Sequence, residues 1–357
     1  MRVISLGSGS SGNALLVEAG PKGRTKILVD AGFNGRTLIE RLRAVGVSPA
    51  QLQGMLITNE HSDHILGLPL LAKRYAVPVI ADPRTVEAIE QIFASGYIAV
   101  DAEQSASLET LADGERSLSE QIISTGQIIR ERQITEEGPL LPGRPQGSPL
   151  PCTNMSDGPE YGNDHSGNGH AAKNQSTISQ LSQPLQVGSR CMVGDIEVVS
   201  FPVSHDAVAP SGYLLSVGGC RVCVAIDSGE VTTTMLEAMN QADLLVLESN
   251  HDREKLLRGP YPHSLKKRIL SPTGHLSNDQ AADAVLRTWR SDGVRWLWLS
   301  HLSRTSNTPK LALNSMRTRL TAARANLSQV HISVLPPGMG GMWDSTQLWH
   351  MPSLWEM

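Results

Sequence analysis

The sequence has few cysteines for its length. Its 357 residues include four: Cys152, Cys191, Cys220 and Cys223. Four thiols are too few to form a disulfide framework in a chain of this size. Cys220 and Cys223 lie three positions apart on a predicted strand, so their side chains should point to opposite faces. We therefore predict core thiols rather than a zinc knuckle, and a reducing cytoplasm as the compartment.

The sequence also lacks a long apolar run and a strong excess of either charge. No run has the length of a membrane-spanning helix, and residues 1–7 enter a predicted strand without the pattern of a signal peptide. We therefore expect no membrane partner. Lysine and arginine number 31 against 35 acidic residues, a formal net charge of −4. This balance gives no global sign of nucleic-acid binding, which would need a local basic patch.

One polar stretch, residues 57–64 (Ile-Thr-Asn-Glu-His-Ser-Asp-His), organises the rest of the sequence. An apolar segment, residues 55–57, comes before it, and residues 65–75 have apolar side chains at helical spacing. The pattern predicts a strand, a short loop and a helix. Open α/β sheets place their chemistry in such loops, and imidazole and carboxylate are the usual ligands of zinc and similar ions. The alternative is a polar turn in which Ser62 or Asp63 caps the helix.

Three more isolated polar residues follow other predicted strands: His205, Asp227 and His301. Each has a structural alternative when taken alone. A single histidine is more often a structural residue than a ligand, and Asp227 precedes the turn residues Ser228 and Gly229. Together with residues 57–64, the three favour a metal site at the ends of several strands.

These residues carry a resemblance to a known family. Residues 59–64, Asn-x-His-x-Asp-His, resemble the His-x-His-x-Asp-His signature of the metallo-β-lactamase fold, with Asn59 as the departure at the first position. Further matching segments follow in order: residues 201–207, 226–229, 248–252, 273–278 and 299–303. Their context resembles the YycJ/WalJ-like branch, small proteins of this fold described as DNA exonucleases. The resemblance implies an α/β protein with a four-layer αβ/βα sandwich.

The resemblance covers residues 1–97 and 191–338, which indicates one domain over residues 1–338. Residues 101–189 interrupt it and are rich in Ser, Gly, Pro, Gln and Asn. Such a segment buries too little apolar surface to offset its ordering entropy. We predict a largely disordered insertion with one short helix near residues 118–131. The tail, residues 339–357, contains three tryptophans, but no periodicity predicts where they dock.

The resemblance also implies two divalent ions, zinc or manganese, and assigns their ligands. One ion would bind Asn59, His61 and His205, the other Asp63, His64 and His301, with Asp227 bridging the two. Such ion pairs lie about 3.5–4 Å apart and activate a water as nucleophile. Asp63 and Asp227 would be the catalytic carboxylates, Asp63 orienting the water or taking its proton. An amide oxygen binds such ions less well than imidazole, so Asn59 predicts a weak or empty first site.

Two segments offer donors for a substrate phosphate. The glycine-rich loop of residues 7–13 has no lysine and is therefore not a P-loop. Its polar side chains, Ser8, Ser10, Ser11 and Asn13, either form a flexible turn or bind phosphate. His275, Ser277 and Asn278 lie at a predicted helix start, which attracts anions, and Asn250 and His251 are weaker candidates. Capping is the alternative for Ser277 and Asn278, and a solvated helix face is the alternative for the basic residues 266–268.

The sequence as a whole favours a metal-dependent phosphodiesterase or exonuclease that acts on nucleic acid, with DNA favoured. Two alternatives stay open. The same metal site would suit a hydrolase of a small ester, thioester or lactone. A metal-binding module with impaired catalysis is the other alternative, because Asn59 replaces the usual histidine.

Overall fold

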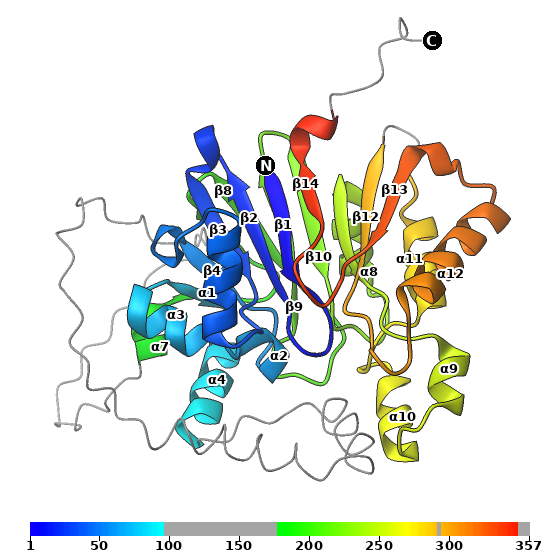
Figure 1. Ribbon diagram of the computed structural model, residues 1–357, viewed down its shortest axis with the longest axis horizontal. Helices are drawn as coiled ribbons and strands as arrows, with labels where there is room; N and C mark the ends of the chain where they lie inside the picture. Colours follow the sequence, from blue (N-terminus) through cyan, green and yellow to red (C-terminus); the bar gives the residue numbers. More distant parts are fainter. Residues whose placement is uncertain (96–176, 291–293, 349–357) are drawn as a thin grey trace, which may run out of the picture.

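The computed structural model describes residues 1–95, 177–290 and 294–348, which form two seven-stranded sheets packed face to face (Figure 1). The first sheet has the order β14-β1-β2-β3-β4-β5-β6 and the second β13-β12-β11-β10-β9-β8-β7. Helices cover the outer face of each sheet, which gives four layers in the order helix, sheet, sheet, helix. The predicted αβ/βα sandwich is confirmed.

The first sheet is antiparallel on one side and parallel on the other. Its strands are β1 (Arg2–Gly7), β2 (Ala14–Ala19), β3 (Thr25–Val29), β4 (Gly54–Leu56), β5 (Val79–Ala81), β6 (Ser182–Pro184) and β14 (Met342–Asp344). Strands β3 to β6 run parallel to one another. Parallel neighbours bring their carboxyl ends to one edge, so the loops after β3 and β4 lie together.

The second sheet repeats this plan. Its strands are β7 (Arg190–Val193), β8 (Ile196–Pro202), β9 (Ser211–Val217), β10 (Cys220–Ala225), β11 (Leu244–Glu248), β12 (Arg295–Ser300) and β13 (Val330–Val334). Strands β9 and β10 form a hairpin, and its turn residues Gly218 and Gly219 have φ angles of 56° and 84°. Strands β10 to β13 are parallel, so the loops after β10, β11 and β12 meet at one edge.

Eight helices cover the two outer faces and two more form a small separate unit in the described part of the chain. The helices on the first sheet are α1 (Gly35–Ala44), α2 (Ser62–Ile65), α3 (Leu68–Tyr75), α4 (Pro83–Ser95) and α7 (Thr177–Leu181). Those on the second are α8 (Thr233–Gln241), α11 (Asn278–Arg287) and α12 (Pro309–Ala322). Helices α9 (Arg253–Arg258) and α10 (His263–Ile269) pack around their own small apolar cluster.

Burial separates the side chains of each strand into two sets. Val3, Tyr213 and Trp298 belong to the cluster between the sheets, whereas other strand residues face the covering helices. Cys220 belongs to the cluster between the sheets and Cys223 to the helix-covered face, as predicted from their spacing. Burial raises the pKa of each thiol to about 12, which makes both thiols inert core groups.

The prediction of one continuous helix over residues 65–75 is wrong. The chain forms α2, breaks at Gly67 and restarts as α3. The Gly67 N–H donates to the Ala31 carbonyl, and a β-carbon at Gly67 would lie 2.6 Å from the Phe33 carbonyl oxygen. Only glycine allows this close approach. Helix α2 starts at Ser62 with no side-chain cap, so neither Ser62 nor Asp63 is the N-cap.

The predicted end of the insertion at residue 189 is also wrong. Residues 177–189 belong to the fold, because α7 packs against α3 and α4 and β6 pairs with β5. Ile178 and Leu185 are buried in the core. The composition of this segment did not predict its order, because it contributes only two buried apolar side chains and otherwise contacts the fold through the backbone pairing of β6 with β5. The predicted helix near residues 118–131 lies outside the described residues.

The tail likewise begins later than predicted. Strand β14 pairs with β1, and Trp343 is fully buried between the two sheets. The boundary at residue 338 is therefore wrong, and Trp343 is a core residue. Trp349 and Trp355 lie outside the described residues. In the described part of the chain, no helix combines the length and the hydropathy that crossing a membrane requires.

Two deletions should differ in stability because only one of them removes core residues. Deletion of residues 105–185 removes Ile178 and Leu185, whereas deletion of residues 105–172 keeps both. Loss of a buried leucine or isoleucine side chain costs about 2–5 kcal/mol, so the longer deletion should have a clearly lower free energy of unfolding in urea titrations. Equal values for the two variants would exclude residues 177–185 from the core.

Candidate metal centre

Six polar segments meet at one end of the sandwich, the lower end in Figure 1. Each segment lies at the carboxyl end of a strand, and all these strands except β8 belong to the parallel parts of the sheets. The segments are Asp30 after β3, residues 59–64 after β4, His205 after β8, Asp227 after β10, Glu248 at the end of β11 and His301 after β12. All the residues named in this paragraph except His61 have buried side chains. The sheet topology therefore brings together groups up to 271 positions apart.

Within this end of the sandwich, three groups of side chains offer ligand atoms that all lie within 4.8 Å of one another. The first is His61, His205 and Asp227. The second is Asp63, His64 and His301. The third is Asp227, Glu248, His275 and His301. The first two groups contain six of the seven residues that the sequence suggested as ligands, and the third adds Glu248 and His275.

Asp227 is common to two of these groups and contacts the other one. Its Oδ2 lies 2.7 Å from His64 Nε2 and 4.0 Å from His205 Nε2, and its Oδ1 lies 2.9 Å from His301 Nδ1. The carboxylate thus faces imidazoles from both predicted sites. A carboxylate in this position is suited to bridging two ions.

The backbone around the centre is strained in three places. Asp30, Asp227 and His301 have φ angles of 62°, 54° and 53°, in the left-handed region that side chains with a β-carbon rarely adopt. Each directly follows a parallel strand or is one residue beyond it. Such strain costs about 1–3 kcal/mol per residue and gathers at functional sites. Here it turns three side chains into the centre.

Asp30 fixes the orientation of His64. Its Oδ2 lies 2.8 Å from His64 Nδ1, and its Oδ1 accepts a hydrogen bond from the Thr58 backbone N–H at 2.9 Å. With Nδ1 held in this way, His64 directs Nε2 toward Asp63 and Asp227. A carboxylate behind a histidine fixes the tautomer and increases the basicity of the free nitrogen.

Glu248 contacts Nδ1 of two other histidines, as Asp30 contacts Nδ1 of His64. Its Oε1 lies 2.7 Å from His275 Nδ1 and 2.9 Å from His301 Nδ1, and its Oε2 accepts from the Ser228 N–H at 2.9 Å. The sequence reasoning missed Glu248 as a site residue. The available signal was its place as a charged residue that ends an otherwise apolar strand.

His61 and His205 face each other across the first group. His61 Nδ1 lies 3.2 Å from His205 Nε2, and His205 Nδ1 lies 3.1 Å from the Gly274 carbonyl oxygen. If Nδ1 of His205 carries the proton for that carbonyl, its Nε2 offers a lone pair toward His61. Two ring nitrogens aimed at one point fit a shared cation.

The charges in the centre compensate one another. Burial opposes ionisation of Glu248, but His275 and His301 outweigh it and lower the pKa of the carboxyl to about 2. Burial also disfavours a charged His275, but Glu248 outweighs it and raises the imidazole pKa to about 9. The pKa of Asp227 is likewise held well below its usual value by His301 and His64 against burial. The carboxylates are therefore ionised at neutral pH, as ligands must be.

Asn59 contacts the centre through its amide nitrogen. Nδ2 donates to Asp227 Oδ2 at 2.8 Å, and Oδ1 accepts from the His61 backbone N–H at 2.9 Å. The side chain thus supports the loop backbone, as asparagine often does, and also positions the shared carboxylate.

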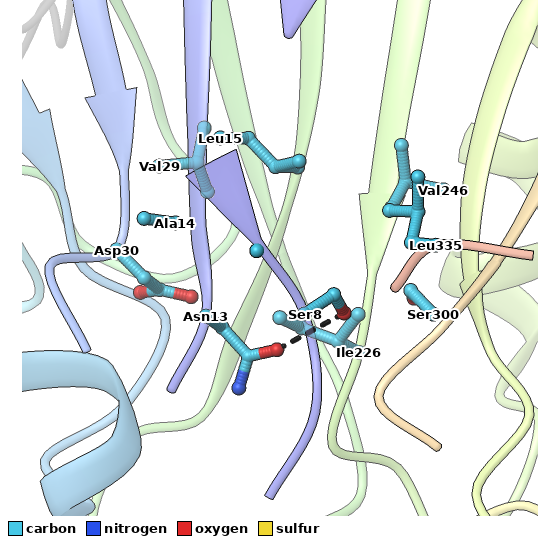
Figure 2. A pocket seen from close by; sticks show the side chains of 11 residues that line it. Ser8, Asn13, Ala14, Leu15, Val29, Asp30, Ile226, Val246, Ser300 and Leu335 are labelled. Atoms are coloured by element: carbon cyan, nitrogen blue, oxygen red, sulfur yellow. Dashed lines mark hydrogen bonds between the residues drawn. The ribbon is translucent and has the colours of Figure 1, made fainter. Parts of the chain in front are cut away.

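The glycine/serine loop (residues 8–13) lies against the centre. Asn13 Nδ2 donates to Asp63 Oδ2 at 3.2 Å, and Ser8 Oγ accepts from the His301 N–H at 2.9 Å. Figure 2 shows Ser8 and Asn13 bonded to each other at the edge of a cavity of about 10 Å³, which is about the volume that one water needs. Ser11 is half-buried and accepts from Arg304, whereas the Ser10 side chain is buried.

The other five residues that the sequence suggested as phosphate ligands have different surroundings. His275 lies in the third group of the centre. Ser277 forms a capping box with Gln280, which is the alternative that the sequence offered. Asn278 does not cap the helix, because it is the first residue of α11 and its side chain bonds to Ser249 and Asn307. Asn250 Nδ2 donates to the His301 carbonyl. His251 is fully buried, and its ring nitrogens have no hydrogen-bond partner among the described residues.

The donor set fits divalent ions. Nδ1 of His64 and of His301 lies against a carboxylate, which leaves Nε2 of each ring directed at Asp63. Imidazole nitrogens and carboxylate oxygens of this number and proximity suit zinc, manganese and similar ions. Carboxylates behind the histidines are the usual support of such ligands. The centre can therefore hold divalent metal at either side of Asp227.

Comparison with known proteins agrees with this geometry. The family model of the metallo-beta-lactamase superfamily matches residues 7–139. Exodeoxyribonuclease WalJ of Streptococcus pneumoniae is 30% identical over 318 residues, 89% of this chain and 87% of WalJ. Exodeoxyribonuclease YycJ of Bacillus anthracis is 30% identical over 311 residues, 87% of this chain and 86% of YycJ.

One solved structure supports the fold. The metallo-beta-lactamase fold protein YhfI of Bacillus subtilis aligns with a TM-score of 0.55 and 12% identity, over 96% of this chain and 99% of YhfI. At that identity the likeness concerns the arrangement of the strands and helices alone. It supports the pairing of two mixed sheets described above.

Replacement of Asp227 by alanine should remove most of the bound metal, because its carboxylate contacts both histidine groups. We expect metal analysis of purified Asp227→Ala to give less than a third of the wild-type content. Glu230→Ala, which removes a carboxylate from the same loop outside the three groups, is the matched control and should keep the full content. Unchanged stoichiometry in Asp227→Ala would exclude Asp227 as a ligand.

Proposed function

Because the chain belongs to the metallo-β-lactamase superfamily, whose members are hydrolases, we propose that it is a metal-dependent phosphodiesterase that degrades nucleic acid from its ends. DNA is the favoured substrate. The observation that carries the proposal is the position of Asp227, which forms one group with His61 and His205 and contacts His64 and His301 of another. The names of the two exodeoxyribonuclease relatives support the choice of substrate.

We assign the ligands as the resemblance implies. Asn59, His61 and His205 would hold one ion and Asp63, His64 and His301 the other, with Asp227 between them. Divalent ions there would supply positive charge for the phosphoryl group and acidify water near neutral pH. Zinc or manganese is the proposed ion. The cytoplasm is the proposed compartment, where the buried thiols of Cys220 and Cys223 would stay reduced.

Asp63 is the proposed proton acceptor for the attacking water. Its Oδ2 lies 3.2 Å from His301 Nε2 and accepts a hydrogen bond from Asn13 Nδ2 at 3.2 Å. These two contacts hold Oδ2 in place. A base that is held in place needs less reorganisation when the proton moves.

Glu248 is the proposed positioning residue for His275 and His301. Its two oxygens accept from side chains and from the Leu276 N–H, so the carboxylate links two loops of the second sheet. His275 remains the proposed contact to a substrate phosphate, since its ring lies in the third group of the centre, 5.3 Å from the His301 ring. The glycine/serine loop would supply further donors beside it.

A substrate screen tests the proposal. The purified protein is incubated with end-labelled single- and double-stranded DNA and RNA, and in parallel with small esters, thioesters and lactones, each with Zn²⁺ or Mn²⁺. We expect stepwise shortening of DNA, and loss of that activity in Asp63→Asn. Turnover of a small ester or lactone without cleavage of any nucleic acid would overturn the proposal. Metal binding with no hydrolysis at all would instead indicate a non-catalytic module.

Asn59→His should strengthen the first metal site. Residue 59 lies beside Asp227 and two positions before His61, so an imidazole there can reach the ion that His61 and His205 would hold. We expect the metal content to rise toward two ions and turnover to increase at limiting metal. Asn59→Ala removes the amide without adding a ligand and serves as the control, with no gain expected.

Metal titrations of the three proteins separate the remaining explanations. Inhibition of Asn59→His by a second equivalent of metal would indicate a mechanism that uses one ion. Titration curves identical to those of the wild type would mean that position 59 is not a ligand position, and the assignment of Asn59 would then be wrong.

A further inference from the structure

Arg304 differs from Arg268, the arginine that contacts the loop after β8. Arg268 pairs with Asp206 through two hydrogen bonds, as is usual for arginine near a carboxylate. Arg304 instead donates to a hydroxyl, Ser11 Oγ, at 2.7 Å. Within the described residues, no salt bridge involves Arg304. An exposed guanidinium held by a neutral hydroxyl keeps its charge available for an anion.

The position of Arg304 connects it with both sides of the centre. It lies three residues after His301, and its partner Ser11 belongs to the glycine/serine loop. The same two segments are joined by the hydrogen bond from the His301 N–H to Ser8 Oγ at 2.9 Å. Two hydrogen bonds thus join the glycine/serine loop to the segment after β12. The bond between Ser8 and His301 lies at the centre, and the bond between Ser11 and Arg304 is exposed.

The backbone under Arg304 is fixed. The Ser303 N–H donates to the Asn250 carbonyl at 2.9 Å, and Ser303 Oγ accepts from the Ser306 N–H at 3.0 Å. These bonds hold the residues on both sides of Arg304. Asn307 continues the support with hydrogen bonds to the carbonyls of Ser249 and Asn250. Only the exposed side chain of Arg304 is left to move.

A nucleic-acid strand needs a local cation on this protein. The whole chain carries a net charge of −4. A polyanionic substrate meets no general attraction from such a protein. Guanidinium binds phosphate oxygens in a bidentate manner, and a serine hydroxyl can donate to a third oxygen.

We propose that Arg304 and Ser11 together bind a phosphate of the nucleic-acid strand that neighbours the phosphate being hydrolysed. The inference rests on the proposed function, because it identifies how that substrate is positioned. On binding, Arg304 exchanges the Ser11 oxygen for phosphate oxygens, and the freed Ser11 hydroxyl donates to the same group. Arg304 is a positioning residue and takes no part in the bond cleavage.

Oligonucleotide binding measured by fluorescence anisotropy at several salt concentrations tests the proposal independently of turnover. Each phosphate contact that is lost reduces the slope of log K against log[salt] by about 1, because about one counterion fewer is released on binding. Arg304→Ala should therefore bind a single-stranded oligonucleotide about tenfold more weakly and with a smaller salt slope. Arg304→Lys should keep the slope but lose part of the affinity. Arg317→Ala removes an exposed arginine from the middle of α12 and should leave both quantities unchanged.

Kinetics with two substrates supply a readout that a merely structural role would not give. Arg304→Ala should raise the KM for the oligonucleotide about tenfold with little change in kcat. Hydrolysis of bis(4-nitrophenyl) phosphate, which has no neighbouring phosphate, should stay at the wild-type rate. Ser11→Ala should show the same pattern with a smaller rise in KM.

The outcomes distinguish this inference from the proposed function. An Arg304→Ala protein with wild-type salt slope and KM would overturn the inference alone. Equal loss of activity on both substrates, with a lowered melting temperature, would also overturn it and assign Arg304 a structural role. A wild-type protein that binds the oligonucleotide but cleaves neither substrate would overturn the proposed function and leave the phosphate contact standing. No binding by the wild type would overturn both.

Discussion

The shared carboxylate of Asp227 is the interaction on which the rest of the site depends. It lies between imidazoles from both sheets, within 2.7 Å of His64 and 2.9 Å of His301. A buried carboxylate is stable only when opposite charges and hydrogen bonds surround it. The two sheets must therefore pack so that the loops after β4, β8, β10 and β12 reach one point, and the apolar cluster between the sheets holds them there.

The surrounding residues show how the protein meets this constraint. Asp30 and Glu248 stand behind the histidines and balance their charge, and both are fully buried. Removing one partner from such a network leaves an uncompensated buried charge, which costs about 3–5 kcal/mol. The left-handed backbone at Asp30, Asp227 and His301 adds strain, which the packing of the parallel strands offsets. The buried charges and the strained backbone lower the stability of this end of the sandwich, and the same features fix the positions of the candidate ligand atoms.

Local patterns in the sequence predicted the strand-end loops and their polar residues, because each depends on a few adjacent side chains. The opposite faces of Cys220 and Cys223 were predicted for the same reason and are confirmed. Glu248 was missed because its partners, His275 and His301, lie 27 and 53 positions away. Trp343 gave no periodic signal, since its burial depends on pairing of β14 with β1 at the opposite end of the chain. Contacts between residues so far apart in the chain leave no pattern among neighbouring residues, so the sequence did not predict them.

The account makes a central claim about where metal binds, and anomalous diffraction from crystals soaked in Zn²⁺ or Mn²⁺ tests it most directly. Data collected at the absorption edge of each metal locate the ions without any assay of activity. The account predicts anomalous density beside Asp227, with one peak near His64 and His301 and a second, weaker peak near His61 and His205. Density elsewhere on the protein, with none within coordination distance of Asp227, would contradict it.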